Sequence, residues 1–581
     1  MKPYPTPALI VLSAALLFAA CSKDDIDASS TAATTPSTDT SSGDENVEEF
    51  NESSFDRTIT LTWTSSGVTK SGDENNVVSI SGTAATVDNT GTSEKVIYVL
   101  SGSCSDGSLK LYSNNKQALK LSGLSLSCSS GAAINNQGKK SCYVIVSGTN
   151  TLSDSSSAAY SASGSEDMKA VFFSEGQLLF SGSGSLTVTA ANAQGKAGIT
   201  SDDYVWMDGP TVKITAGSSA GHGLRGKEFV AVNGGSLDIS VAAAMKKGIT
   251  SDSLVVFNGG TTSVKVTGGT AYDSDDKEYK ASAGVKADQV FKMNDGTLTV
   301  TNSGQGGKGI SSDLQGYFNG GTVKVTVSGS NYGSSSSGMG GPGGWGGWGS
   351  SSSSSDNSVA AKGIKFDGNL VFAGGTVSVT AKSHEAIESK GTIEVKGGRI
   401  FAQSSDDAIN AASHLTISDG YVCAYSTGND GLDSNGNMYI KGGVVYAVGK
   451  GSPEVALDAN TESGYKLYVS GGTLFAVGGL ENGAQLTQSC YSASWNKNSW
   501  YAVTVGDKTY AFKTPSSGGN GLVVSAASKP ELKSGVSVSG GESIFEGMGL
   551  IAPEVSGGSS VSLSGYSGGG GFGGGGFGPG W

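Results

Sequence analysis

The sequence predicts an all-β protein built as a parallel β-helix of roughly 10–13 coils, with β-rich caps at both ends. One motif recurs about ten times across residues 196–479, usually in steps of 22–25 residues. Each copy opens with a small and an aliphatic residue, such as Gly248-Ile249, and closes with a glycine turn and an alternating strand, such as residues 374–380. This step has the length of three short strands with their turns, so stacked copies would place equivalent residues about 4.8 Å apart.

The aliphatic residue of each copy, called the anchor below, marks the predicted inner side of the coils. The anchors are Ile199, Leu224, Ile249, Val285, Ile310, Ile364, Ile387, Ile409, Leu432 and Leu457. Two steps are longer, 36 and 54 residues, because each contains an insertion. The first insertion is an acidic loop with Asp273, Asp275, Asp276 and Glu278. The second, residues 329–358, carries Trp345 and Trp348 among glycines and serines, and these rings could stack on sugars or pack onto the coils.

The amino terminus is typical of an exported protein. Residues 1–20 are predicted to be a lipoprotein signal peptide, because Lys2 precedes an apolar run at 8–20 that is too short to span a bilayer permanently. The run ends in Leu-Phe-Ala-Ala-Cys at 17–21, which resembles a lipobox and predicts lipidation of Cys21; an ordinary signal peptidase site is the alternative. The Ser-Lys-Asp-Asp segment at 22–25 resembles an export signal for surface lipoproteins. We therefore expect an outer-membrane lipoprotein exposed on the cell surface and touching the membrane only through its lipid.

The remaining segments follow in order along the chain. Residues 21–54 are polar and have almost no large apolar side chain, which predicts a disordered tether. Residues 55–190 have the same pattern less regularly and are predicted to form an N-terminal cap and irregular first coils. Residues 191–480 form the regular β-helix, 481–566 a C-terminal cap, and 567–581 a glycine-rich tail.

Charge and cysteine content exclude several classes of function. The net charge of −13 and the acidic pI leave no basic face for nucleic acid, and instead suit neutral polymers or multivalent cations. None of the cysteines after Cys21 forms a CxxC pair, so a zinc or redox site has little support. These cysteines are Cys104, Cys128, Cys142, Cys423 and Cys490. Cys104 and Cys128 lie about one coil apart, so they could form a disulfide or be two buried thiols.

Alignment on the anchors sorts the charged residues into two zones. In the early coils, aspartates stand three positions after the anchor and alternate with lysines and arginine, which predicts either ion-paired structural ladders or a second-tier metal site. These residues are Asp202, with Asp203 beside it, Asp252, Asp288, Asp313 and Asp367. The basic residues near them include Lys247, Lys308 and Lys362, two positions before the anchor, and Arg225, Lys286 and Lys365, one position after it.

In the later coils, acids stack on acids with few basic neighbours besides Lys390. Carboxylates about 5 Å apart repel by roughly 3 kcal/mol per pair at an effective dielectric constant near 20. A cation with oxygen ligands would relieve this repulsion, and outside the cell that cation is calcium. The predicted Ca²⁺ ligands are Glu385, Glu388, Asp406, Asp407, Asp430, Asp433 and Asp458. A solvated acidic face is the alternative.

Several copies resemble one family. Gly-Ile-Thr-Ser-Asp at 198–202 and 248–252, Gly-Ile-Ser-Ser-Asp at 309–313, Asp-Ala-Ile-Asn at 407–410 and Asp-Gly-Leu-Asp at 430–433 are similar to the bacterial calcium-binding carbohydrate-binding domain family, whose members bind cellulose and polygalacturonate. The resemblance implies a right-handed, single-stranded, pectate-lyase-like parallel β-helix with bound calcium and no demonstrated catalysis. The chain departs from the family pattern at Arg225-Gly226-Lys227 and in its Trp-rich insertion.

We therefore expect a surface-anchored protein that binds a cellulose-like or pectic (uronate) polysaccharide on a calcium-containing face. A pectate-lyase-like lyase or a hydrolase is the main alternative, because basic residues adjoin the acidic coils and a lyase needs a base to remove the proton next to the uronate carboxylate. These candidates are Lys362, Lys365, Lys382, Lys390 and Arg399. An adhesive or structural fibre without a sugar ligand is the third possibility.

Overall fold

A computed structural model describes residues 47–162, 164–333 and 358–568. The chain divides into two compact units, Met1–Glu48 and Glu49–Trp581, and the description below concerns the second. The predicted lipidation residue Cys21 and the insertion residues Trp345 and Trp348 lie outside the described residues, so those three predictions stay predictions. Within the described ranges, no helix is long and apolar enough to cross a membrane.

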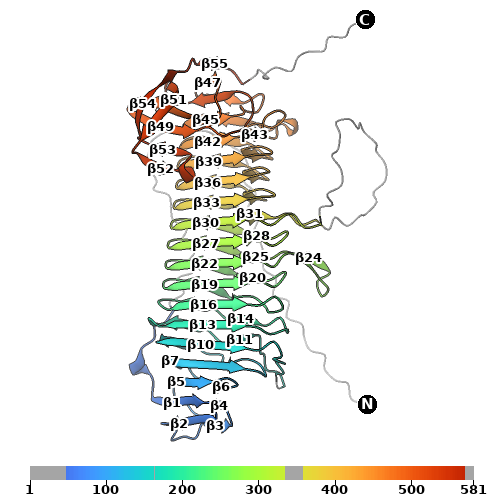
Figure 1. Ribbon diagram of the computed structural model, residues 1–581, viewed down its shortest axis with the longest axis vertical. Coiled ribbons are helices and arrows are strands. Elements are labelled where there is room, and N and C mark those ends of the chain that lie inside the picture. The colour runs from blue at the N-terminus through green and yellow to red at the C-terminus, as the bar shows by residue number, and fades with distance from the viewer. Residues whose placement is uncertain (1–46, 163, 334–357, 569–581) are drawn as a thin grey trace, which may run out of the picture. The chain divides into compact units, whose positions relative to one another are not determined.

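The second unit is a column of stacked coils, each contributing one strand to each of three sides (Figure 1). One side is a separate sheet of fifteen strands, called the anchor sheet because it carries the anchors. Its strands are β3 (Val78–Ser81), β4 (Ala84–Asn89), β6 (Ser108–Ser113), β8 (Ile134–Asn136), β11 (Ala170–Ser174), β14 (Ala197–Ser201), β17 (Leu224–Gly226), β20 (Lys247–Ser251), β25 (Ala283–Ala287), β28 (Lys308–Ser312), β31 (Lys362–Phe366), β34 (Ile387–Ser389), β37 (Ile409–Ala411), β40 (Leu432–Ser434) and β43 (Leu457–Ala459).

The other two sides belong to one sheet of 32 strands, because the long early strands continue from one side to the other. The second side comprises β9 (Cys142–Ser147), β12 (Leu178–Ser181), β15 (Val205–Met207), β18 (Phe229–Val232), β21 (Leu254–Phe257), β26 (Val290–Met293), β29 (Gln315–Phe318), β32 (Leu370–Phe372), β35 (Ile393–Val395), β38 (Leu415–Ile417), β41 (Met438–Ile440), β44 (Leu467–Val469) and β46 (Gln485–Leu486). The third side comprises β10 (Thr149–Asp154), β13 (Ser185–Ala190), β16 (Thr211–Ala216), β19 (Ser236–Val241), β22 (Thr261–Val266), β27 (Thr297–Asn302), β30 (Thr322–Val327), β33 (Thr376–Ala381), β36 (Arg399–Ser404), β39 (Tyr421–Ser426), β42 (Val444–Val448) and β45 (Thr473–Val477). The early strand β7 (Gln117–Cys128) pairs with both β9 and β10 and so runs along both sides, and β5 (Val96–Cys104), β1 (Arg57–Thr64) and β2 (Gly67–Ser71) follow it toward the N-terminal end.

Parallel pairing places every anchor directly on the next. Ile199 pairs with Leu224, which pairs with Ile249, and the series continues without a shift to Leu457. All ten anchors are at most 2% exposed, so the ladder forms part of a continuous core. The predicted parallel β-helix is therefore confirmed. Turn glycines permit the close stacking: at Gly375, with φ 75°, an added Cβ would lie 2.5 Å from the carbonyl oxygen of Gly320 in the coil below.

The solenoid has about 15 turns, more than the predicted 10–13. The difference arises in residues 84–190, whose irregular spacing conceals complete coils. Phe172 pairs with Ile199 below the regular series, and Ile134 and Leu109 extend the same buried ladder toward the N-terminus. Antiparallel pairing of β2 with β1 and of β3 with β4 covers the first coil.

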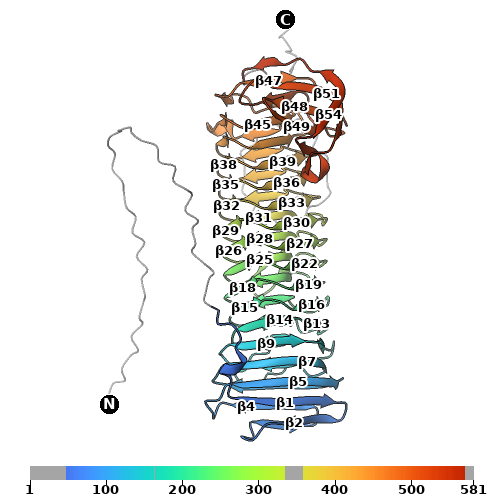
Figure 2. The same cartoon turned by 90° about the vertical axis from the view of Figure 1, so that its left-hand side faces the viewer.

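The C-terminal segment covers both the end and one side of the last coils (Figure 2). Strands β47 (Cys490–Ala493), β50 (Leu522–Ser525) and β55 (Ser564–Tyr566) close the 32-stranded sheet by antiparallel pairing. A six-stranded antiparallel sheet packs against the third side; it comprises β48 (Trp500–Val505), β49 (Lys508–Lys513), β51 (Glu531–Ser539), β52 (Glu542–Ile544), β53 (Gly549–Ile551) and β54 (Glu554–Ser560). The outer face of the last coils is apolar where this cap lies, with Phe401, Tyr446 and Phe475 buried against Tyr501 and Phe512.

Smaller elements complete the fold. Short 3-10 helices are η1 (Glu52–Ser54), η2 (Thr461–Ser463) and η3 (Phe545–Gly547). The acidic insertion forms a hairpin of β23 (Ala271–Asp273) and β24 (Glu278–Lys280). Cys104, Cys128, Cys142, Cys423 and Cys490 are all buried free thiols, so Cys104 and Cys128 do not form the disulfide that their spacing allowed.

Candidate functional site

Two rows of ionisable side chains run along the anchor sheet, and both change sign at the same coil. The inner row stands two residues before the anchor and comprises Lys247, Lys308, Lys362, Glu385, Asp407 and Asp430. The outer row stands one residue after the anchor and comprises Arg225, Lys286, Lys365, Glu388, Asp433 and Asp458. We call the coils from Arg225 to Lys308 the basic segment and those from Glu385 to Asp458 the acidic segment.

Strand register places the outer row in line. Lys365 pairs with Glu388, Glu388 with Asn410, Asn410 with Asp433, and Asp433 with Asp458. Paired residues of adjacent parallel strands lie about 4.8 Å apart, so their side chains are direct neighbours. Asn410, which the sequence analysis did not single out, thus occupies the position between two carboxylates; its place one residue after the anchor was the available signal.

Lys362 joins the two segments. Its Nζ lies 3.1 Å from Glu385 Oε2 and 2.6 Å from Glu388 Oε2, and all three residues are buried. Lys390 also pairs with Glu388. For Glu385 and Glu388 the prediction of few basic neighbours is therefore wrong, because stacking brings a lysine from the preceding coil to both carboxylates.

His384 adds a second partner for Glu385. Its Nδ1 contacts Glu385 and lies 3.1 Å from Asp406 Oδ2, and the three residues can bring one ligand atom each within 4.8 Å of one another. Burial alone would raise the pKa of Glu385, but the His384 hydrogen bond and the Lys362 charge lower it to about 2. Lys362 and His384 therefore stabilise the charged form of Glu385. His384 was not among the predicted site residues, although it is one of only three histidines in the chain and directly precedes Glu385.

The remaining carboxylates of the two rows have no basic side chain as a partner in the part of the chain that the structure describes. They are Asp407, Asp430, Asp433 and Asp458. The amide Nδ2 of Asn410 donates to Asp407 Oδ2 at 3.2 Å and to Asp433 Oδ2 at 2.5 Å. The backbone N–H of Asp430 donates to Asp407 Oδ1 at 3.1 Å, and that of Val455 donates to Asp430 Oδ1 at 2.5 Å.

Burial raises the pKa of each of these four side chains. It raises the pKa of Asp407 to about 6 and that of Asp433 to about 7, and neighbouring carboxylates add to both shifts. Burial and the charges of Asp458 and Asp407 raise the pKa of Asp430, while burial and Glu481 raise that of Asp458. Near neutral pH this group therefore either takes up protons or requires a cation. The metal-ligand atoms that these four side chains offer are all oxygens, the kind a hard cation such as Ca²⁺ prefers. Among the described residues, however, no three of these side chains bring ligand atoms within 4.8 Å of one another.

The basic segment shows the reverse shift. Burial, and then the nearby lysines, lower the pKa of Lys308 to about 7 and that of Lys247 to about 8. Both ammonium groups donate to backbone carbonyls, Lys247 to that of Met245 at 2.7 Å and Lys308 to that of Ala360. Burial and Lys247 also lower the pKa of His222, which precedes Lys247 by one coil.

The second-tier aspartates contact basic or amide side chains. Arg225 donates to both carboxylate oxygens of Asp252, at 2.9 and 2.8 Å. Lys286 lies 3.3 Å from Asp288 and contacts Asp313, and Lys365 contacts Asp367. Asp203 accepts from Gln177, and Lys169 lies between Asp167 and Asp202 at 2.7 and 2.5 Å. Asp167, Glu175 and Asp202 could hold a metal ion by their spacing, but the Lys169 ammonium already neutralises two of them.

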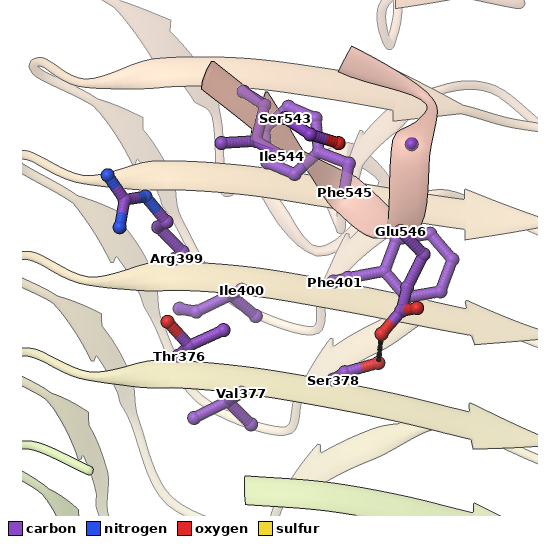
Figure 3. A pocket seen from close by; sticks show the side chains of 11 residues that line it. Thr376, Val377, Ser378, Arg399, Ile400, Phe401, Ser543, Ile544, Phe545 and Glu546 are labelled. Atoms are coloured by element: carbon purple, nitrogen blue, oxygen red, sulfur yellow. Dashed lines mark hydrogen bonds between the residues drawn. The ribbon is translucent and has the colours of Figure 1, made fainter. Parts of the chain in front are cut away.

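A groove of about 500 Å³ lies between the cap and the outer face of β33 and β36 (Figure 3). It is lined by Thr376, Val377, Ser378, Arg399, Ile400, Phe401 and residues 543–547. Glu546 accepts from Ser378 Oγ at 2.6 Å and lies 3.6 Å from Lys324 Nζ, while Glu542 pairs with Arg399. These contacts join the cap to coils more than 140 residues earlier in the chain. The charged side chains that line the groove therefore hold the cap against the coils. The sequence did not indicate this groove.

Comparisons with known proteins found matches to a solved structure and to a family model. One solved structure, that of the polysaccharide lyase-like protein from C. thermocellum in its gadolinium derivative, aligns with 18% sequence identity over 47% of this chain and 95% of that chain, with a TM-score of 0.31. No curated protein sequence matches the chain. The family model described as carbohydrate-binding domain-containing protein matches residues 81–243, 239–333 and 349–508, which together form more than half of the chain. The chain therefore belongs to the family of carbohydrate-binding domain-containing proteins.

Proposed function

We propose that this protein is a non-catalytic, surface-anchored receptor for polysaccharide that holds Ca²⁺ among Asp407, Asp430, Asp433 and Asp458. The observation that carries the calcium assignment is a stack of four largely buried carboxylates on three consecutive coils, with no basic side chain facing them in the described residues. Bound calcium would supply the positive charge that keeps these carboxylates ionised. Glu385, Glu388 and Asp406 adjoin the stack but already have Lys362, Lys390 and His384 as partners.

The family supports a polysaccharide ligand, and the acidic segment favours one class of it. A calcium ion bound by protein carboxylates can also attract the carboxylate of a uronate, so a pectic polymer fits this segment. Cellulose-like glucans remain the second ligand class. For anchoring, we propose lipidation at Cys21 and display on the outer membrane, which substitution of Cys21 by alanine and protease treatment of intact cells would test.

The deciding experiment uses the full chain. Retention on polygalacturonate and on insoluble cellulose is measured with calcium or with EGTA, while absorbance reports unsaturated products. Calcium-dependent retention without product is expected. The Asp407→Asn/Asp433→Asn variant should lose retention on polygalacturonate, whereas Asp288→Asn, which changes an aspartate already paired with Lys286, should not. If EGTA did not reduce retention on polygalacturonate, the calcium assignment would be wrong.

One observation favours the lyase as a second candidate. Lys308 has a pKa lowered to about 7, chiefly by burial, and adjoins Lys362 at the edge of the acidic segment. A lysine that is partly neutral at pH 7 can accept a proton from a carbon next to a carboxylate. Appearance of unsaturated product, abolished in Lys308→Met, would establish the lyase and reject the non-catalytic receptor.

A further inference from the structure

The acidic insertion forms a hairpin with two chemically different faces. It projects from the column beside β25 (Figure 1). Strands β23 and β24 pair antiparallel, with Tyr272 opposite Tyr279 and Asp273 opposite Glu278. Residues directly opposite each other share one face of a hairpin, and the next pair lies on the other face. The two tyrosines therefore lie together on one face, and the charged residues lie on the other.

Ion pairs stabilise the charged face. Lys280 Nζ lies 3.0 Å from Asp273 Oδ2, contacts Asp276 and lies 3.9 Å from Glu278 Oε1. Asp273 Oδ1 also accepts from the backbone N–H of Asp275 at 3.0 Å, inside the turn. A two-stranded hairpin alone is marginally stable in water, so these contacts help to hold it in place.

The aromatic face continues onto the body of the solenoid. The rings of Tyr272 and Tyr279 lie 5.2 Å apart at 63°, and those of Tyr279 and Tyr332 lie 5.4 Å apart at 43°. Tyr332 is fixed by two backbone hydrogen bonds with Val359, of 2.9 and 3.0 Å. We call Tyr332, Tyr279 and Tyr272 the tyrosine row. It leads from a fixed coil outward to Tyr272, which is 52% exposed.

Exposure of Tyr272 sets it apart, because among the described residues only Tyr272 and Tyr465 are exposed large aromatics. A folded chain gains little from presenting a row of rings to water, whereas aromatic rings are efficient binding surfaces with few rotatable bonds. Pyranose rings with equatorial hydroxyls expose C–H faces that pack flat on such rings. The hairpin turn and strands carry four carboxylates, Asp273, Asp275, Asp276 and Glu278, against Lys277 and Lys280, a net charge of 2 − 4 = −2. This charge disfavours a polyanionic uronate chain at this position.

We infer that the tyrosine row is a binding site for the pyranose rings of a neutral, β-linked glucan. The inference rests on the proposed function and extends it: neutral glucan binds at the tyrosine row, and uronate polymer binds at the acidic segment. The two sites have separate side chains, and only binding at the acidic segment would depend on calcium.

The test is equilibrium binding of the full chain to a soluble neutral β-glucan and, separately, to polygalacturonate with calcium. In Tyr272→Ala/Tyr279→Ala we expect at least about tenfold weaker binding of the neutral glucan, because truncating aromatic anchors at the centre of a contact has effects of this size. Binding of polygalacturonate should be unchanged. Tyr465→Ala is the matched control, since it removes an aromatic ring that is 39% exposed elsewhere on the solenoid. Tyr272→Phe, which retains the ring, should bind nearly as well as the wild type.

Each result has a definite consequence. If the wild type binds the neutral glucan and the double variant binds it equally well, the inference is wrong and the proposed function stands. If the wild type binds polygalacturonate but no neutral glucan, the inference is again overturned alone. If the wild type binds neither polymer, the proposed function fails as well. An unchanged circular dichroism spectrum and melting temperature of the double variant show that a loss of binding is not a loss of fold.

Discussion

The basic and acidic segments have the same backbone and opposite electrostatics. In both, the anchor is buried and the ionisable side chains occupy the same two positions beside it. In the basic segment, the outer row pairs with nearby aspartates and the inner lysines donate to backbone carbonyls. In the acidic segment, Asp407, Asp430 and Asp433 accept only from amide and backbone donors among the contacts of the described residues, and Asp458 lies against the carboxyl group of Glu481.

The difference shows that one solenoid can carry a basic and an acidic site at equivalent positions, because each coil contributes one side chain to each row. The backbone register makes neighbours of residues about one step apart. Replacing the basic residue of each coil with an acidic one then changes a row of ion-paired side chains into a row of carboxylates that need protons or a cation. Lys362 lies where the two segments meet and is the most informative single position.

Replacement of Lys362 should have the largest effect on stability. Lys362→Met leaves Glu385 and Glu388 buried without that positive charge, and breaking a buried ion pair in this way costs about 3–5 kcal/mol. Chemical denaturation of the calcium-free protein measures the change. Lys213→Met is the control: its ion pair with Asp238 is 3.9 Å long and more than half exposed, so little loss is expected. Equal losses in the two variants would remove the distinction between buried and surface pairs.

Calcium should stabilise the acidic segment and leave the basic segment unchanged. At a free calcium concentration of 100 times Kd, the expected gain in unfolding free energy is about 2.7 kcal/mol. Hydrogen exchange resolved along the chain should show added protection in β37, β40 and β43, and this protection should disappear in Asp433→Asn. If the added protection appeared around Lys247 and Lys308 instead, the cation would bind in the basic segment and the calcium assignment would be wrong.

The two segments should respond to pH with opposite signs in calcium-free solution. The pKa of Asp407 and that of Asp433 are raised from 3.8 to about 6 and 7, so their contribution to stability is present below about pH 4 and is lost as the pH rises toward 7. The pKa of Lys308 and that of Lys247 are lowered from 10.5 to about 7 and 8; the unfolded chain binds more protons between those values and 10.5, so stability rises with pH there. Segment-resolved hydrogen exchange, corrected for intrinsic rates, measures both trends. Parallel trends would contradict the assigned shifts.

Removal of an outer-row cation from the basic segment should have the smallest effect. Lys286→Ala breaks pairs with Asp288 and Asp313, both about half exposed, and such pairs contribute about 0–1 kcal/mol. The loss should shrink further at high salt, because exposed pairs are screened. Thermal unfolding at two salt concentrations checks this. A loss of stability as large as that expected for Lys362→Met would mean that the outer row of the basic segment stabilises the fold as strongly as the buried ion pairs of Lys362.

The sequence predicted the repeated part of the structure in detail, because the spacing of equivalent residues fixes which residues pair between neighbouring coils. Every anchor from Ile199 to Leu457 is paired as the alignment placed it. The first coils were underestimated, since Phe172 and Ile134 continue the ladder without the Gly-Ile signature. The cap was predicted at 481–566, but its position over one side of the last coils was not. The apolar outer residues Phe401, Tyr446 and Phe475 interrupt the polar alternation, and this signal becomes meaningful only once the cap strands are seen to cover them.

The sequence by itself determined the fold class, the stacking register and the sign of charge in each coil, because all three depend on residues at a fixed spacing. Only the tertiary structure decided which acids are neutralised. Glu385 and Glu388 lose their need for a cation through Lys362, which is more than 20 residues away along the chain and within 3.1 Å in space. The same structure separated the tyrosines of the acidic insertion from its carboxylates, because strand pairing places them on opposite faces of one hairpin.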